Sequence, residues 1–149
     1  MIDQTAENET FNDRAAWVEP VLTIIAFAKS RYEAVLFKFN ETVSQRGMLS
    51  AIEWQAHDLA YHQAIWDEVR SMADFINDMD GKPDADKAAK IVRSLEALKA
   101  ATIDCFRIPS STSIFSNAIE GAKMEAKIKM FGDNGTFTAI LKTIKKGQN

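Results

Sequence analysis

The sequence predicts an all-α protein, a single bundle of four to five helices, on three observations. Apolar residues recur at spacings of three and four along most of the chain, whereas the alternation typical of strands is hard to find. Gly (6) and Pro (3) are scarce and interrupt these stretches at only a few places. With 149 residues, 46% of them hydrophobic, the chain can bury a core without a disulfide or a metal. We therefore expect residues 1–149 to form one helical domain.

The first long helix is predicted from its apolar seam. A polar tail of about residues 1–11 comes first, and Pro20 then suits a first helical turn, where its missing N–H costs nothing. The seam runs at helical spacing through Val21, Ile25, Ala28, Tyr32, Val35 and Phe39. Four further apolar residues widen it: Leu22, Ile24, Phe27 and Leu36. This pattern predicts a helix that is buried on more than one side and ends at Gly47.

The second helix is predicted to start at Ser50, because Glu53 follows three residues later as in a capping box. Its apolar stripe reads Ile52, Ala56, Leu59, His62, Trp66, Val69, Met72 or Ala73, Ile76 and Met79. The clearest break in the chain follows at Asp80-Gly81-Lys82-Pro83. We interpret residues 80–84 as the only candidate hinge.

Three further helices complete the predicted bundle. One starts at about Asp84 and ends at Ile108-Pro109, with an apolar register of Ala88, Ile91, Leu95, Leu98, Thr102 and Cys105. Another covers roughly residues 112–131, and the composition of residues 132–135 predicts a tight turn after it. The last covers about 136–146 and carries an apolar stripe at i, i+3, i+4 and i+7.

Several features predict a cytoplasmic protein that does not enter a membrane. The first fifteen residues carry acids and no basic cluster ahead of an apolar stretch, so we expect no signal peptide. The longest apolar stretch, residues 21–28, is far shorter than the ~20 residues that cross a bilayer. Cys105 is the only cysteine, which excludes an internal disulfide and favours a reducing compartment.

Charge is distributed unevenly around a net value of −3. Residues 1–80 contain 6 basic and 14 acidic side chains, whereas residues 81–149 contain 12 basic and 7 acidic ones. Such asymmetry can steer a partner or favour head-to-tail self-association. The alternative interpretation is that two oppositely charged faces of one bundle attract each other.

Two histidines are the first candidates for chemistry. Glu53 precedes His57, and Asp58 precedes His62, by the four residues at which a carboxylate orients an imidazole along a helix. The histidines themselves lie five residues apart, about 140° around the helix, so they do not share a metal ion. Cys105 has no histidine near it in sequence to act as a base, and no phosphate-binding loop occurs. We therefore predict a protein that is not an enzyme and has no catalytic residue, metal or cofactor.

Aromatic side chains give the main hypothesis for function. Trp54 and Tyr61 lie on one predicted helix and form a partly exposed strip, a composition typical of interaction hot spots, although such rings also fill cores. We predict a helical interaction protein (an inhibitor, immunity protein or small assembly factor) that binds a macromolecular partner or itself. The predicted partner-binding residues, on acidic and aromatic helix surfaces, are Trp54, Asp58, Tyr61, Asp67 and Glu68.

Basic residues near the C-terminus give the alternative. A surface that faces phosphates is predicted from Lys123, Lys127, Lys129, Lys142, Lys145 and Lys146. The segment Ala118–Lys146 has a lysine-bearing helix, a Gly/Asn turn and an apolar helix, and it resembles the tail of small terminase subunits of tailed phages. This resemblance implies a DNA-associated packaging or regulatory subunit. The acidic first 80 residues depart from that family's order, in which a basic DNA-binding module comes first.

Overall fold

The computed structural model describes residues 14–78, 81–104 and 114–147 and places five α-helices in them. They are α2 (Val18–Arg46), α3 (Met48–Asn77), α4 (Asp84–Asp104), α5 (Ile114–Met130) and α6 (Thr136–Gly147). These residues contain no strand, which confirms the all-α prediction. Cys105 and the predicted polar tail lie outside the described residues.

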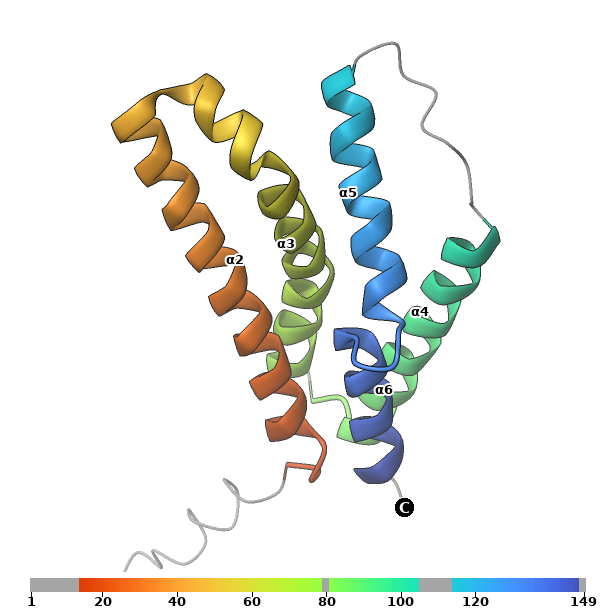
Figure 1. The fold of residues 1–149 in the computed structure, drawn as a ribbon. Coiled ribbons are helices and arrows are strands. Elements are labelled where there is room, and N and C mark those ends of the chain that lie inside the picture. The colour runs from red at the N-terminus through yellow and green to blue at the C-terminus, as the bar shows by residue number, and fades with distance from the viewer. Residues whose placement is uncertain (1–13, 79–80, 105–113, 148–149) are drawn as a thin grey trace, which may run out of the picture.

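The helices form a bundle that is complete only at one end (Figure 1). The two longest helices, α2 and α3, make an antiparallel hairpin that extends over the full height of the molecule in this view. α5 runs beside α3 in the same direction, while α4 and the short α6 lie toward the lower end. The lower half of the hairpin is therefore surrounded by other helices, and its upper half is not.

Gly47 alone connects α2 to α3. Its φ of 91° and ψ of 167° lie in a region that is open essentially only to glycine, which explains the stop that the sequence predicts there. α3 begins at the next residue, with no side-chain hydrogen bond to cap it. The predicted capping box of Ser50 and Glu53 is therefore wrong, because the glycine makes the whole reversal.

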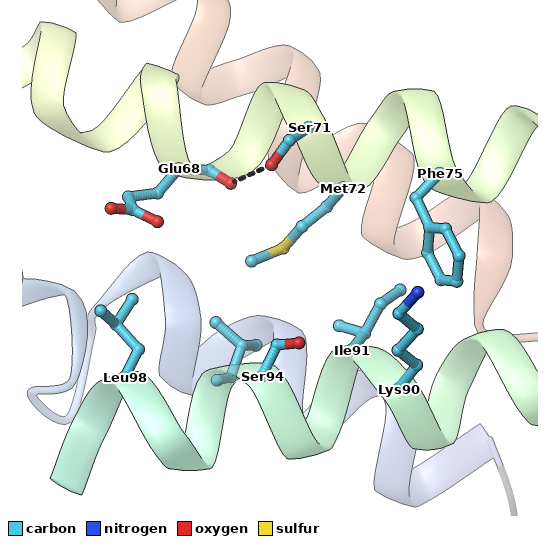
Figure 2. A pocket seen from close by; sticks show the side chains of 9 residues that line it. Glu68, Ser71, Met72, Phe75, Lys90, Ile91, Ser94 and Leu98 are labelled. Carbon is cyan, nitrogen blue, oxygen red and sulfur yellow. Dashed lines mark hydrogen bonds between the residues drawn. The ribbon is translucent and has the colours of Figure 1, made fainter. Parts of the chain in front are cut away.

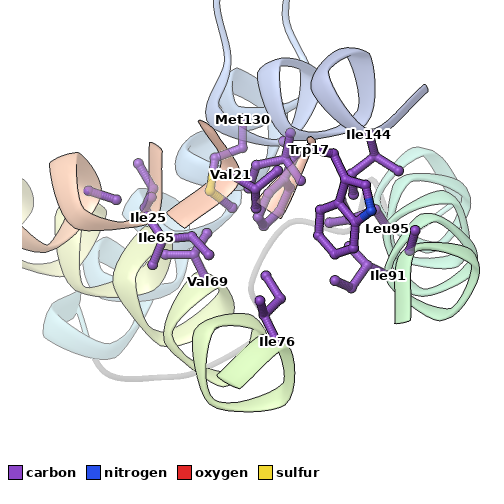
Figure 3. Close-up of a cluster of buried hydrophobic side chains, with 14 of the residues drawn as sticks. Trp17, Val21, Ile25, Ile65, Val69, Ile76, Ile91, Leu95, Met130 and Ile144 are labelled. Carbon is purple, nitrogen blue, oxygen red and sulfur yellow. The ribbon is translucent and has the colours of Figure 1, made fainter. Parts of the chain in front are cut away.

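The core fills the lower half of the bundle (Figure 3). Trp17, only 2% exposed, packs there beside the C-terminal end of α6, and Phe137, Ile140 and Ile144 of α6 are fully buried. α2 contributes Val18, Val21, Ile25 and Ala28; α3 contributes Ile65, Val69 and Ile76; α4 contributes Ala88, Ile91 and Leu95; and α5 contributes Ala126 and Met130. Burial of α2 ends at Ala28, one third of the way along the helix.

The structure limits two predictions about apolar seams. Tyr32, Val35 and Phe39 continue the α2 seam but are only half-buried, and Phe27 is 64% exposed. The prediction that α2 is buried on more than one side is therefore wrong for its upper part, because α3 is the main described helix packed along α2 there. The predicted single stripe of α3 is also divided, since Val69 and Ile76 enter the core while Ile52, Ala56 and Leu59 do not.

Lys87 fastens the end of α3 to the beginning of α4. Its side chain is buried, and its ammonium donates to the backbone oxygens of Ile76 at 3.1 Å and Asp78 at 2.6 Å. The Ile76 carbonyl belongs to the last turn of α3 and Asp78 is its C-cap residue, so the ammonium lies where the helix dipole also favours a cation. The nearby Asp84 carboxylate accepts a 2.8 Å hydrogen bond from the N–H of Ala15. The start of the described chain is thereby held at the same junction.

The tight turn predicted at residues 132–135 is confirmed between α5 and α6. The N–H of Gly135 donates to the oxygen of Gly132 at 3.0 Å, and the N–H of Ala139 donates to the oxygen of Gly135 at the same distance. A Cβ on Gly135 would overlap the backbone oxygens of Lys129 and Met130. This close approach requires glycine, and it brings α6 directly beneath the end of α5.

Candidate interaction surface

The main candidate surface is the side of α2 and α3 that lies above α6. α6 has only 12 residues against the 29 and 30 of the hairpin helices, so it covers only part of their length. Two hollows follow one another along the uncovered part. The lower, of about 400 Å³, lies among Phe27, Arg31, Tyr61, His62 and the start of α6; the upper, of about 430 Å³, lies among Ala34, Val35, Lys38, Trp54, Gln55 and Asp58. We call the residues of α2 and α3 that line these two hollows the contact face.

Cations accompany the exposed aromatic rings of the contact face. Trp54 is 54% exposed, and the guanidinium of Arg46 lies 5.4 Å from its ring centre. Phe27 has the guanidinium of Arg31 at the same distance. Such cation–π contacts stabilise exposed rings only slightly. They do place arginine and aromatic groups together, the residue types that dominate binding energy at interfaces.

Tyr61 lies in a cluster that joins α3 to α5. Nε2 of His57 is 2.9 Å from Oε2 of Glu125, and Oε1 of the same carboxylate accepts a 2.8 Å hydrogen bond from Lys129. The Lys129 ammonium is also 5.5 Å from the centre of the Tyr61 ring. Hydrogen bonds from Lys129, and then from His57, lower the pKa of the Glu125 carboxyl, and that carboxylate raises the pKa of Lys129.

The predicted partner-binding residues do not share one surface. Trp54, Asp58 and Tyr61 all belong to the contact face or its edge. Asp67 lies nine residues after Asp58, about 180° around the helix axis, and borders a different groove. Glu68 lines a hollow of about 330 Å³ between α3 and α4, in which Met72 and Phe75 face Ile91 and Lys90 (Figure 2).

His62 lies at the edge of the core rather than among metal ligands. Burial, and then the Arg31 guanidinium, lower the pKa of its imidazole, while Asp58 acts in the opposite direction. Its ring meets Tyr61 edge-on at 5.0 Å. Within residues 14–78, 81–104 and 114–147, no three His, Cys, Asp or Glu side chains lie close enough together to hold a metal ion.

The six lysines predicted to face phosphates are spread over two helices, and three of them have acidic partners. Lys123 pairs with Glu120 at 3.4 Å, Lys129 pairs with Glu125 as described, and Lys145 pairs with Glu96 of α4 at 3.5 Å. Lys127 is half-buried on α5, whereas Lys142 and Lys146 are exposed on α6.

Sequence reasoning missed the turn end of the hairpin. Met48 and Leu49, directly after Gly47, are 53% and 82% exposed, and Phe37, ten residues before it on α2, is 70% exposed. A signal for Met48 and Leu49 was available, because two large apolar residues directly follow the predicted helix stop and join no stripe. Together with Trp54, they place several large apolar side chains at one end of the molecule.

Comparisons add no relative from which a site could be transferred: no protein-family model, no curated protein and no solved structure matches this chain. Among the helices that the structure describes, none combines the length and the apolar character needed to span a membrane.

Proposed function

We propose that this chain is a non-enzymatic interaction protein that binds a macromolecular partner through the contact face. The observation that carries the proposal is the position of Trp54 and Phe27, two largely exposed rings. Phe27 lies beside the lower hollow, which the start of α6 borders, and Trp54 lies beside the upper hollow, which α6 does not reach. Exposed aromatic rings beside hollows on one face are typical of surfaces that bind another macromolecule. An inhibitor, an immunity protein and a small assembly factor all fit this description.

Charge on the contact face refines the sequence-based hypothesis. Arg31, Lys38 and Arg46 lie on the α2 side of the hollows, and Asp58 lies on the α3 side. The surface is therefore mixed in sign rather than acidic, which favours a protein partner with both charges over a purely cationic one. The proposal includes a cytoplasmic location, which rests on the single cysteine of the sequence, because small secreted domains usually depend on disulfides.

Site-directed photocrosslinking in cells tests this proposal. A photoreactive amino acid replaces Ala34, which is exposed in the upper hollow, and in a matched protein it replaces the exposed Ala97 of α4. We expect a discrete crosslinked protein from position 34 only. The partner, once identified and purified, should lose about tenfold or more in affinity with Trp54→Ala.

Crosslinking to the same proteins from both positions, or full affinity of the Trp54→Ala protein, would contradict the proposal. The DNA-associated alternative has its own outcome in a gel-shift assay at low salt. Binding that weakens with the Lys142→Ala and Lys146→Ala changes, and that falls steeply as salt rises, would favour the alternative over an interaction with protein.

A further inference from the structure

A second apolar face of α3 forms a groove on the side of the helix away from the core. Its apolar residues Ile52, Ala56 and Leu59 recur at spacings of four and three, roughly 125° around the helix from Ile65, Val69 and Ile76. They are half-buried in a hollow of about 740 Å³. Phe39 of α2 borders this groove on one side, and Ala118 and Ile119 of α5 border it on the other.

The groove has the length and the floor that a helix would fit. From Ile52 to Asp67 it follows α3 for about 22 Å, or four turns. Ala56, Ala60 and Ala64 lie four residues apart along its floor, and their small side chains let a second helix approach α3 closely there. Nothing else in residues 14–78, 81–104 and 114–147 covers this face.

Two charged residues of the rim, Lys123 and Asp67, are placed to pair with an identical groove; within the chain they make only exposed ion pairs, with Glu120 at 3.4 Å and Arg70 at 3.9 Å. The 2.9 Å contact between His57 and Glu125 sets the register of α5 along α3, which places Lys123 near the level of Gln55, at the Ile52 end. Asp67 lies at the other end, about 18 Å away. A two-fold axis near Ala60 therefore brings Lys123 of each copy toward Asp67 of the other.

We propose that two copies of this chain associate through the groove, with their α3 helices antiparallel across a two-fold axis. Apolar surface then meets apolar surface, and Lys123 meets Asp67 twice. A parallel arrangement would instead place Lys123 opposite Lys123 and Asp67 opposite Asp67. The inference concerns a face of α3 other than the contact face, so it stands or fails separately from the proposed function.

The size of the groove sets the expected strength. A contact 22 Å long and two helix diameters wide covers on the order of 450 Å² per copy, or roughly 900 Å² in total. This lies at the low end of specific interfaces. The dimer should therefore dissociate on dilution, and association must be measured over a wide concentration range.

Sedimentation velocity of the full chain and matched variants tests the inference. Ala60→Glu places a charge at the centre of the groove, while Ala97→Glu adds the same charge on an exposed position of α4. We expect concentration-dependent dimers from the unaltered chain and from Ala97→Glu, and an affinity about tenfold weaker or more from Ala60→Glu. Both variants should keep the unaltered circular dichroism spectrum and unfolding midpoint.

Charge reversal tests the orientation. Lys123→Asp and Asp67→Lys should each weaken the dimer by about fivefold, and the two together should restore it to within about twofold. Lys142→Asp on α6 controls for the change of net charge and should have no effect. Glu53→Gln should strengthen the dimer, because Glu53 borders the groove at the Lys123 end and faces the same Asp67.

Three results would overturn the inference. One is a monomer at every concentration. If Ala60→Glu then keeps the unfolding midpoint, the groove stays open; if Ala60→Glu lowers it, another segment of the same chain fills the groove. Another is a dimer that Ala60→Glu leaves intact. The third is a dimer that Trp54→Ala abolishes, because self-association would then use the contact face, in agreement with the proposed function.

Discussion

Two valines on the same seam of α2 test how far the core extends. Val21 is fully buried in the lower half, whereas Val35 is half-buried beside an open hollow in the upper half. Replacing each by alanine removes the same two methyl groups and gives the same small gain in helix propensity. The difference between the two variants therefore reports the surroundings alone.

The expected magnitudes follow from burial. At about 0.8 kcal/mol per buried carbon, Val21→Ala loses about 1.6 kcal/mol of transfer free energy, and the cavity left in the core raises the loss to about 2.5 kcal/mol. Val35→Ala loses about half of the transfer term and leaves no closed cavity, so its loss should stay below about 1 kcal/mol.

Urea denaturation followed by circular dichroism measures both losses. If the free energy of unfolding falls with urea concentration at the same slope in both variants, both expose the same amount of surface on unfolding, and their free energies of unfolding can be compared. A loss from Val35→Ala as large as that from Val21→Ala would refute the reasoning, because it would mean that the upper part of the hairpin is packed as tightly as the core.

Three further predictions concern polar groups of the bundle. Lys87→Met should lower the free energy of unfolding by about 2–3 kcal/mol, since the carbonyls of Ile76 and Asp78 lose a charged donor. An unchanged free energy of unfolding in urea denaturation would contradict this role of Lys87. The lowered pKa of His62 means that the folded state binds its proton less readily than the unfolded chain does, so stability is fully present above about pH 6.5 and declines below it. His62→Gln should flatten this decline in urea denaturations at a series of pH values, and an unchanged slope would exclude His62 as its source. Gln55→Met should leave the free energy of unfolding unchanged or raise it by up to about 1 kcal/mol, because the carbonyl oxygen of Gln55 is buried without a partner in the described residues while only its amide bonds Thr42. A loss of about 2 kcal/mol in urea denaturation would show that this oxygen has a partner.

The sequence was sufficient to predict the helices and the breaks between them. Gly47, Pro83 and the two glycines of the 132–135 turn have local conformational requirements that need no knowledge of distant residues. Helical period likewise reports which face of a helix is apolar. For these reasons the class of the fold and most helix ends could be read from the chain.

Periodicity does not tell what covers an apolar face. The α2 seam keeps one spacing from Val21 to Phe39, yet burial ends at Ala28 because the neighbouring α6 is short. The length of a partner helix and its place in the bundle are properties of the whole fold. The same limitation explains why Ile52 and Val69, assigned to one predicted stripe, face different parts of the molecule.

The sequence predicts part of how the candidate residues are placed, while their binding role stays a prediction. Trp54, Asp58 and Tyr61 lie on one face of α3, because their spacings of four and three keep them there. Asp67 follows Asp58 by nine residues, which at about 100° per residue places it on the opposite side of the helix. Lys87, by contrast, could not have been found, because its partners are backbone oxygens of another helix.

The single glycine between the two long helices also decides whether the hairpin forms within one chain. The helical hydrogen bonds of both helices reach Gly47, since its N–H donates to the oxygen of Val43 at 3.0 Å and its own oxygen accepts from the N–H of Ala51 at 3.3 Å. Only the φ and ψ angles of this residue separate the hairpin from a continuous rod about 90 Å long. Two such rods can exchange their α2 segments and recreate every α2–α3 contact between chains, as in domain swapping. A side chain at position 47 would raise the energy of the hairpin by about 1–3 kcal/mol but not that of the rod, so glycine favours closure within one chain.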